Sequence, residues 1–331
     1  MNLIPFNQTG LEVTPIGLGL AALGRPGYIN LGHSADLGHD YDVGSMESRA
    51  HSVLDTAWES GIRYFDAARS YGRAEVFLSS WLRSRGIRPS EVVVGSKWGY
   101  VYTAGWQVEA EKHEVKDHSL SVYKRQLDES LDLLGDYLDL YQIHSATLDS
   151  GVLDNWEVLE ALGDLRDGGI VVGISLSGPN QAETLRKAMT IEVGNKLLFG
   201  SVQATWNLLA REATEVLKEA HDLGMGVIIK EALANGRLTA RNDDPEFAAQ
   251  KEVLEQIALE LNITIDTVAL SFVLAQPWAD IVLSGAAQTE HLLSNIRALD
   301  TVWTNALEDR LGGLVEPAWQ YWDTRSRLDW N

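Results

Sequence analysis

Short apolar runs alternate along the chain with longer stretches in which apolar residues recur every three or four positions. Eight runs are short enough to be strands, and several lack the polar alternation of a half-exposed strand, so both of their faces are expected to be covered. These runs are Pro15–Leu20, Ile62–Asp66, Val92–Gly95, Leu138–Ile143, Ile170–Ile174, Gly200–Gln203, Val227–Lys230 and Ile281–Leu283. The pattern predicts eight buried strands that alternate with helices.

Helical spacing is clearest in four of the intervening stretches. Thr264 and Thr289 are predicted to cap two further helices, because a threonine oxygen accepts a hydrogen bond from a first-turn N–H. Strand–helix alternation implies a parallel sheet, and eight units favour closure into a (β/α)8 TIM barrel over an open sheet. The expected apolar stripes are Phe77–Leu82, Leu120–Leu134 (through Leu127 and Leu131), Ala213–Leu223 and Leu254–Leu261.

The barrel is expected to form a single domain over residues 1–331, with its core at about residues 12–300, because no linker or repeat divides the chain. A glycine-rich segment, Gly24–Gly44, follows the first strand as a long loop at the active site. Its His33 and His39 are expected at the surface. The tail of residues 301–331 is expected to pack or to contact a partner through Trp303, Trp319, Trp322 and Trp330.

Composition narrows the classes of function. The absence of cysteine removes disulfides, thiolate nucleophiles and zinc–thiolate sites. The 27 basic residues against 47 acidic ones give a net charge of −20, which disfavours binding to nucleic acid. No run approaches the ~18 apolar residues of a membrane span, and Met1–Gly10 lacks the pattern of a signal peptide. We expect a cytoplasmic protein with a small-molecule substrate, and the oligomeric state stays open.

One glycine motif suggests a dinucleotide fold and is better explained otherwise. Gly17–Ala22 (GLGLAA) fits a relaxed dinucleotide-binding fingerprint, which requires a helix to begin at once. Pro26, Gly27 and Gly32 follow instead, without a helical stripe. A glycine-bearing first barrel strand is therefore favoured. No H-x-H stands at a strand end, so no metal site is expected.

Four polar residues lie at or just after the ends of three consecutive predicted strands. Asp66 ends the second strand, Tyr71 follows five residues later, Lys97 follows the third, and His144 ends the fourth. In a parallel barrel these strand ends open at one mouth, where barrel active sites are built. The four side chains are therefore predicted to converge.

The chemistry of this set follows from proton affinities. A nearby lysine cation favours phenolate and is expected to lower the tyrosine pKa from about 10, which eases proton donation. A carboxylate beside the lysine would hold it in place, and a neutral imidazole would orient a carbonyl oxygen. The set suits protonation of a carbonyl, or deprotonation of an alcohol, while another group moves a hydride.

With these residues the chain resembles the aldo-keto reductases, and the resemblance spans Ile16 to Asn295. Its most specific piece is Gly61–Gly72 (GIRYFDAARSYG), and its nearest likeness is to the sugar (aldose or galactose) dehydrogenase-like branch. The resemblance implies a single-domain barrel that passes hydride between NAD(H) or NADP(H) and a carbonyl or sugar substrate, without metal. It assigns the catalytic tetrad to Asp66, Tyr71, Lys97 and His144.

The resemblance also implies cofactor positions. Ser175 and Gln203 correspond to carboxamide-binding residues, although Leu176 replaces a usual asparagine. Lys230 stands where an aromatic ring usually stacks on nicotinamide, and Trp206 is a candidate replacement. The pyrophosphate loop, the adenosine end and the first strand supply the remaining expected contacts: Leu233, Asn235, Arg237, Gly285, Ala286, Gln288, His291, Asn295, Gly19, Leu20, Ala21 and Asp66.

Three further expectations complete the sequence reading. Trp98, Tyr100 and Trp106 follow Lys97 and are expected to wall the substrate pocket. Ser284–Asn295 contains no lysine or arginine to meet a 2′-phosphate, which favours NAD(H) over NADP(H). The alternative to an enzyme is a non-enzymatic cofactor-sensing subunit of the same fold, like a potassium-channel β-subunit.

Overall fold

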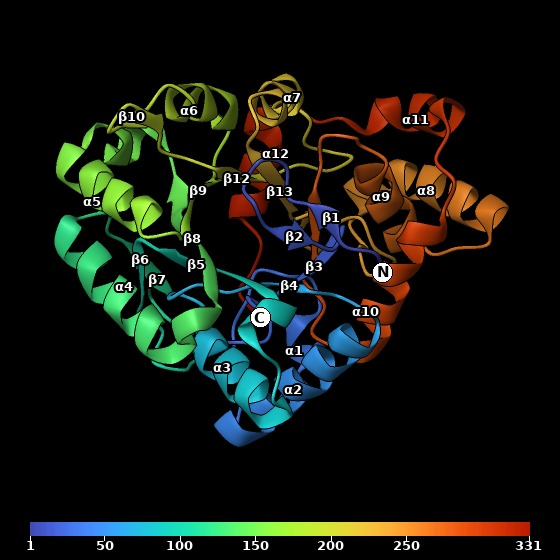
Figure 1. Cartoon of the computed structure of the whole chain (residues 1–331). Coiled ribbons are helices and arrows are strands. Elements are labelled where there is room, and N and C mark those ends of the chain that lie inside the picture. The colour runs from blue at the N-terminus through green and yellow to red at the C-terminus, as the bar shows by residue number, and fades with distance from the viewer.

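Eight parallel strands form a closed barrel in the computed structural model, which describes residues 1–331 (Figure 1). The last strand pairs back to the first through Val282 and Ile16. This confirms the predicted TIM barrel and all eight strand positions. In order around the barrel the strands are β3 (Ile16–Gly19), β4 (Tyr64–Asp66), β5 (Val93–Trp98), β8 (Leu138–Ala146), β9 (Val171–Leu176), β12 (Ser201–Thr205), β13 (Gly226–Lys230) and β14 (Ile281–Ser284).

Helices surround the barrel in chain order, as the colours of Figure 1 show. Two more helices, α11 (Asn305–Leu311) and α12 (Ala318–Ser326), belong to the tail. The C-terminus projects onto the middle of the ring rather than onto its rim (Figure 1). The other helices are α1 (His33–Asp36), α2 (Val43–Glu59), α3 (Ala74–Arg85), α4 (Leu120–Leu134), α5 (Trp156–Asp167), α6 (Gln181–Ala188), α7 (Thr214–Asp222), α8 (Ala248–Leu261), α9 (Ile265–Leu274) and α10 (Thr289–Ile296).

Two strands extend further toward the mouth than their apolar runs indicate. β5 continues to Trp98, because residues 95–98 pair in parallel with residues 140–143, and β8 runs on to Ala146, which pairs with Leu176 of β9. Polar residues therefore stand inside the strands, since one face of each strand end points into the mouth. Lys97 is thus a strand residue held by the pairing with β8, whereas His144 lies in an irregular stretch of β8 between Ile143 and Ala146, where its backbone carbonyl is 2.9 Å from His118 Nε2.

An N-terminal hairpin covers the amino-terminal end of the barrel. Its strands are β1 (Ile4–Pro5) and β2 (Glu12–Val13), which the sequence pattern did not predict. Phe6 is buried with Tyr64 and Ile228 inside the barrel. Its ring lies so close to Gly226 that a side chain there would collide with it. The mouth at the carboxyl ends is thus the accessible end of the barrel interior.

The buried face of α4 differs from the predicted leucine stripe. Leu131 is 37% exposed, whereas the polar Gln126 and Ser130 are buried. Gln126 accepts a hydrogen bond from the Gly99 backbone N–H, and Ser130 donates to Glu75. Polar side chains that hydrogen-bond to neighbouring elements therefore occupy part of the buried face of α4. The spacing of apolar residues cannot predict such buried polar positions.

The other helix predictions need three small corrections. Leu223 is exposed because α7 ends at Asp222, and Leu261 is exposed in the last turn of α8. Thr289 is the first residue of α10 rather than its cap, since Gln288 holds the extended backbone of the N-cap position. Thr264 caps α9 as predicted and accepts from the Thr267 N–H.

Two short hairpins extend the loops. They are β6–β7 (Tyr100–Tyr102 and Glu114–Lys116) and β10–β11 (Glu192–Val193 and Lys196–Leu197). No single helix is long and apolar enough to cross a membrane; one bent pair, residues 245–261 with 265–274, satisfies the length and composition of a span.

The segment Gly24–Gly44 folds against the barrel mouth rather than away from it. The expectation that His33 lies at the surface is wrong: its ring is buried edge-on against Tyr28. Burial lowers the pKa of His33 to about 4, so the imidazole is neutral. His39, beyond the short helix α1, is exposed. The loop therefore supplies packed residues to the mouth.

Candidate active site

A cavity of about 570 Å³ opens at the carboxyl ends of the strands. It extends from Asp66, Tyr71 and His144 to the N-terminal end of α10, where Gly285 and His291 line it. Residues from the first loop, the β6–β7 hairpin and the tail complete its walls. The volume lies in the range of small-molecule and cofactor sites, roughly 300–1,000 Å³.

Asp66 and Lys97 form a buried ion pair at the floor of this cavity. The Lys97 ammonium bonds Asp66 Oδ2 and donates to the Ala67 carbonyl at 2.9 Å. The other carboxylate oxygen accepts from Gln203 at 3.0 Å and from Tyr64 at 3.3 Å. Because each charge has its opposite and further partners, the pair is satisfied despite its burial.

Tyr71 is held beside this pair. The Lys97 Nζ lies 3.4 Å from the phenol oxygen, and the Arg25 guanidinium lies 5.3 Å from the ring centroid. The backbone of Tyr71 follows β4 through a short turn in which its N–H bonds the Ala68 carbonyl. The hydroxyl is thus fixed next to a cation at the cavity surface.

The pKa of Tyr71 moves opposite to the sequence-based expectation. Burial raises it well above 10, and the negative charge of Asp66 adds to the rise. The positive charge of Arg25 lowers the pKa but does not outweigh these two effects. Tyr71 therefore keeps its proton at neutral pH in the free protein.

His144 lies against Tyr71 with ring centroids 5.4 Å apart, and against Tyr100 at 5.0 Å. Its Nδ1 is 3.4 Å from the Ser70 hydroxyl. Burial, together with the positive charges of Lys97, Lys230 and Arg25, holds the pKa of His144 well below 6.5. The ring is the neutral imidazole that the sequence reading anticipated.

The structure brings most of the predicted cofactor positions to this one cavity. Leu20 and Ser175 are buried and do not line the cavity, although Ser175 accepts a hydrogen bond from the lining residue Lys230 at 3.3 Å. Gln288 turns from the cavity and donates to the Asp36 carbonyl. The predicted residues that line the cavity are Gly19, Ala21, Asp66, Gln203, Lys230, Leu233, Asn235, Gly285, Ala286, His291 and Asn295.

Two predicted cofactor residues lie elsewhere. Trp206 stacks on Phe272 in the helical layer, and its indole N–H bonds Thr214, so it does not reach the cavity. Arg237 is paired with Glu316 of the tail at 2.5 Å and does not line the cavity either. Arg237 therefore closes the fold rather than offering a free charge.

Two of the three predicted substrate-pocket residues are also displaced from it. Trp98 is fully buried and packs on Tyr123 and His118, with centroids 5.0 and 5.7 Å away. Trp106 donates to the Tyr41 carbonyl and stands edge-on to Phe77. Tyr100 alone of the three lines the cavity.

Sequence reasoning missed the charged and aromatic wall opposite His144. Arg25 pairs with Glu114 at 2.9 Å and faces Trp330, whose ring stacks on His113 at 3.8 Å. Arg25, Glu114 and Trp330 line the cavity. Trp330 was expected to pack or to contact a partner rather than to line a substrate pocket. It comes to the site because Asn331 exchanges backbone hydrogen bonds with Tyr28 of the first loop.

A buried ion pair ties the tail to the barrel. Glu231 follows β13 with a positive φ of 56°, and its carboxylate accepts from Arg325 of α12 at 2.9 and 2.5 Å. Both residues line the cavity. The neighbouring Lys230 ammonium has a single hydrogen bond, to Ser175, and so presents a cation with spare donors.

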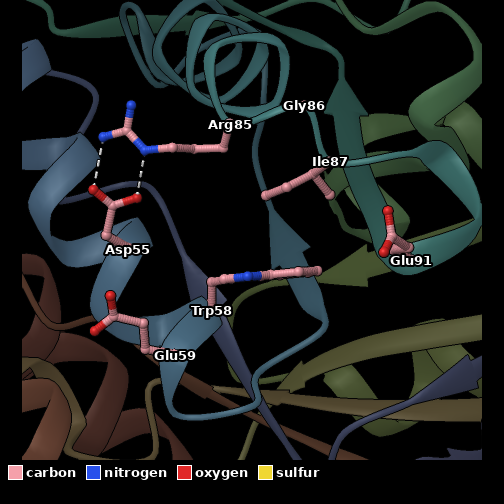
Figure 2. A pocket seen from close by; sticks show the side chains of 7 residues that line it. All are labelled: Asp55, Trp58, Glu59, Arg85, Gly86, Ile87 and Glu91. Atoms are coloured by element: carbon pink, nitrogen blue, oxygen red, sulfur yellow. Dashed lines mark hydrogen bonds and ion pairs between the residues drawn. The ribbon is translucent and has the colours of Figure 1, made fainter.

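A second hollow lies at the opposite end of the barrel, where α2 and α3 finish. Figure 2 shows Arg85 and Asp55 paired across it, with the Trp58 ring and Glu91 at its other edge. Arg85 is paired with Asp55, and Glu91 is paired with Arg88 instead. The hollow gathers no acid–base set comparable to that of the mouth.

The chain is similar to known proteins over most of its length. A family model described as "Aldo/keto reductase family" matches residues 15–309. Pyridoxal 4-dehydrogenase from Microbacterium luteolum is 28% identical over 333 residues, 88% of this chain and 91% of that protein. A probable voltage-gated potassium channel subunit beta from Oryza sativa subsp. japonica is 26% identical, covering 89% and 95%. The holo form of aldo-keto reductase AKR11C1 from Bacillus halodurans has the same fold, with a TM-score of 0.73 at 24% identity over 96% of this chain and 97% of that one.

Proposed function

This chain belongs to the aldo/keto reductase family, and from that premise we propose that it is an oxidoreductase that moves hydride between a nicotinamide cofactor and a small carbonyl or alcohol. The observation that carries the proposal is the convergence of four residues: Asp66, Tyr71 and His144 line the cavity, and Lys97 is buried behind them in contact with Asp66 and Tyr71. A protonated phenol, a paired lysine and a neutral imidazole together can transfer a proton to or from the oxygen of a carbonyl or alcohol. Reduction or oxidation of that group also requires a hydride donor or acceptor, which a nicotinamide cofactor supplies.

The cavity residues fit a nicotinamide dinucleotide. No side chain caps α10, so its first N–H groups are free to meet phosphate. A side chain at Gly285 would meet nothing within 4 Å, so the backbone there is open to a ligand. The buried Asn235 Oδ1, which lines the cavity, lacks any partner. When bound, the cofactor supplies or accepts the hydride.

The protein's own residues handle the proton. In the reducing direction Tyr71 Oη–H donates to the carbonyl oxygen, and Lys97 at 3.4 Å stabilises the phenolate that remains. His144, being neutral, orients that oxygen by a hydrogen bond. Asp66 keeps Lys97 in place. In the oxidising direction the proton follows the reverse path.

The walls favour a polar substrate. Arg25 and Glu114 offer charged hydrogen-bonding groups, while Tyr28, Tyr100 and Trp330 offer aromatic faces. Sugars and hydroxylated aromatic aldehydes present both kinds of surface. We favour these over simple aliphatic aldehydes, and we favour NAD(H) as the cofactor, because Ser284–Asn295 contains no lysine or arginine.

A rate assay tests the proposal. Purified protein is incubated with NADH or NAD⁺ and a panel of sugars, aromatic aldehydes and aliphatic aldehydes, and absorbance at the reduced cofactor's band is followed. Turnover by the wild type that is lost in Tyr71→Phe supports the proposal. Cofactor binding without turnover of any substrate favours the second candidate function, a cofactor-sensing subunit. The similarity to the rice potassium channel subunit is the observation that supports this second candidate.

A further inference from the structure

Asp36 is a buried carboxylate that the first loop carries into the cavity. It ends the short helix α1, and its side chain is 4% exposed. Arg241 bonds both of its oxygens, with Nη1 2.8 Å from Oδ2. His291 Nδ1 lies 3.8 Å from the same carboxylate. All three residues line the cavity.

The cluster of Asp36, Arg241 and His291 stands at the α10 end of the cavity, away from Tyr71. His291 lies in the first turn of α10, and Gln288 donates to the Asp36 backbone carbonyl at 3.0 Å. Arg241 also donates toward the Leu31 and Gly32 carbonyls at 3.3 and 3.4 Å. The carboxylate is thus fixed where the cavity meets the helix N-terminus.

Arg241 is the cation that the sequence reading did not find near the adenosine end. Its charge is matched by Asp36, and both oxygens of Asp36 use its donors. A phosphate entering here would face the carboxylate and would have to displace it from a buried pair. A hydroxyl group, by contrast, donates to a carboxylate without charge conflict.

We propose that Asp36 selects the cofactor: it accepts a hydrogen bond from the ribose 2′-hydroxyl of NAD(H) and excludes the 2′-phosphate of NADP(H). The inference rests on the proposed function, because it assumes a nicotinamide dinucleotide in this cavity. It gives the insertion after β3 a chemical role. Arg241 is neutralised by Asp36 in this arrangement, so it can bind a phosphate only when Asp36 has no charge.

Binding of adenosine fragments tests the assignment without any turnover. Calorimetry measures the Kd of ADP and of adenosine 2′,5′-bisphosphate for wild type, Asp36→Asn and Asp40→Asn. Asp40 lies on the same loop with an exposed side chain, so its variant removes the same charge away from the cavity. We expect wild type and Asp40→Asn to bind ADP at least tenfold more tightly than adenosine 2′,5′-bisphosphate. Asp36→Asn should reverse or abolish that preference, and added salt should weaken the gained phosphate binding.

Arg241 provides the second variant. In the wild-type background, Arg241→Met should weaken binding of adenosine 2′,5′-bisphosphate further. In the Asp36→Asn background, it should remove the affinity for the bisphosphate that Asp36→Asn has gained. If Asp36→Asn changes both affinities by the same factor, Asp36 is only a latch for the loop and the proposal is overturned. A wild type that binds neither fragment nor NADH contradicts the proposed function itself, a distinct result from an unchanged ratio.

Discussion

The pair of Glu231 and Arg325 gives the sharpest stability prediction. The Glu231 carboxylate is 7% exposed and Arg325 is 23% exposed. Arg325 donates three hydrogen bonds to it, and Thr205 donates a fourth at 3.1 Å. Arg325→Met keeps an unbranched apolar side chain, although a shorter one, and leaves Glu231 as a buried charge without its partner.

Removing one partner of a buried pair costs about 3–5 kcal/mol, and the partial exposure of Arg325 places this case near ~3 kcal/mol. At roughly 2 °C per kcal/mol for a chain of this size, Tm should fall by ~6 °C. The double variant Glu231→Gln/Arg325→Met removes both charges and should recover part of the loss. Thermal and urea unfolding of wild type, Arg325→Met, Glu231→Gln and the double variant form a double-mutant cycle.

A matched control and the pH dependence complete the test. Arg310→Met breaks an exposed pair with Glu260 and should cost less than about 0.5 kcal/mol. Burial raises the pKa of Glu231, but Arg325, with help from Lys230 and Thr205, outweighs it and lowers the pKa below the usual value. The pair's contribution is therefore complete above the unfolded pKa and is lost as pH falls through the folded one. A Tm for Arg325→Met within about 1 °C of wild type at pH 7 would refute this reasoning.

Other substitutions test the site. Tyr71→Phe should lower kcat at least ~10²-fold with an unchanged NADH Kd; retained activity would remove the proton-donor assignment. Trp330→Ala should raise KM for the best substrate, whereas Trp98→Ala should cost about 3–5 kcal/mol in urea unfolding, because Trp98 is core. Burial, together with Arg325 and Lys97 and against Glu231, lowers the pKa of Lys230 to about 8. The protonated Lys230 ammonium repels the positive pyridinium ring of NAD⁺, so the Kd of NAD⁺ should fall as pH rises through about 8, while the Kd of NADH changes little. Lys230→Met should flatten this pH dependence. A wild-type Kd for NAD⁺ that does not depend on pH would place the pyridinium ring away from this ammonium.

The barrel and the convergence of Asp66, Tyr71, Lys97 and His144 were predictable, because both depend on where the strands lie and end. Strands covered on both faces give apolar runs, and polar residues at their carboxyl ends must meet at one mouth. The same rule could have placed Trp98. Successive strand residues point to opposite faces, so once Lys97 points inward its neighbour must point to the helices.

The remaining errors concern partners that are distant in sequence. Arg237 pairs with Glu316, which is 79 residues away, and Arg241 pairs with Asp36, which is 205 residues away. No local sequence pattern predicts pairs at such separations. The direction of the Tyr71 pKa was missed for a related reason. It depends on how deeply the fold buries the phenol and on the negative charge of Asp66 beside it.

The pairing of β3 with β14 has a consequence for synthesis. Ile16 leaves the ribosome early, but its partner Val282 follows roughly 270 residues later, which at ~5–20 residues per second takes about 15–50 s. During that interval one edge of β3 has no neighbour and is free to pair with another nascent chain. Fragments that stop before Ile281 keep that edge open permanently, so they are expected to aggregate and to require chaperones throughout their lifetime.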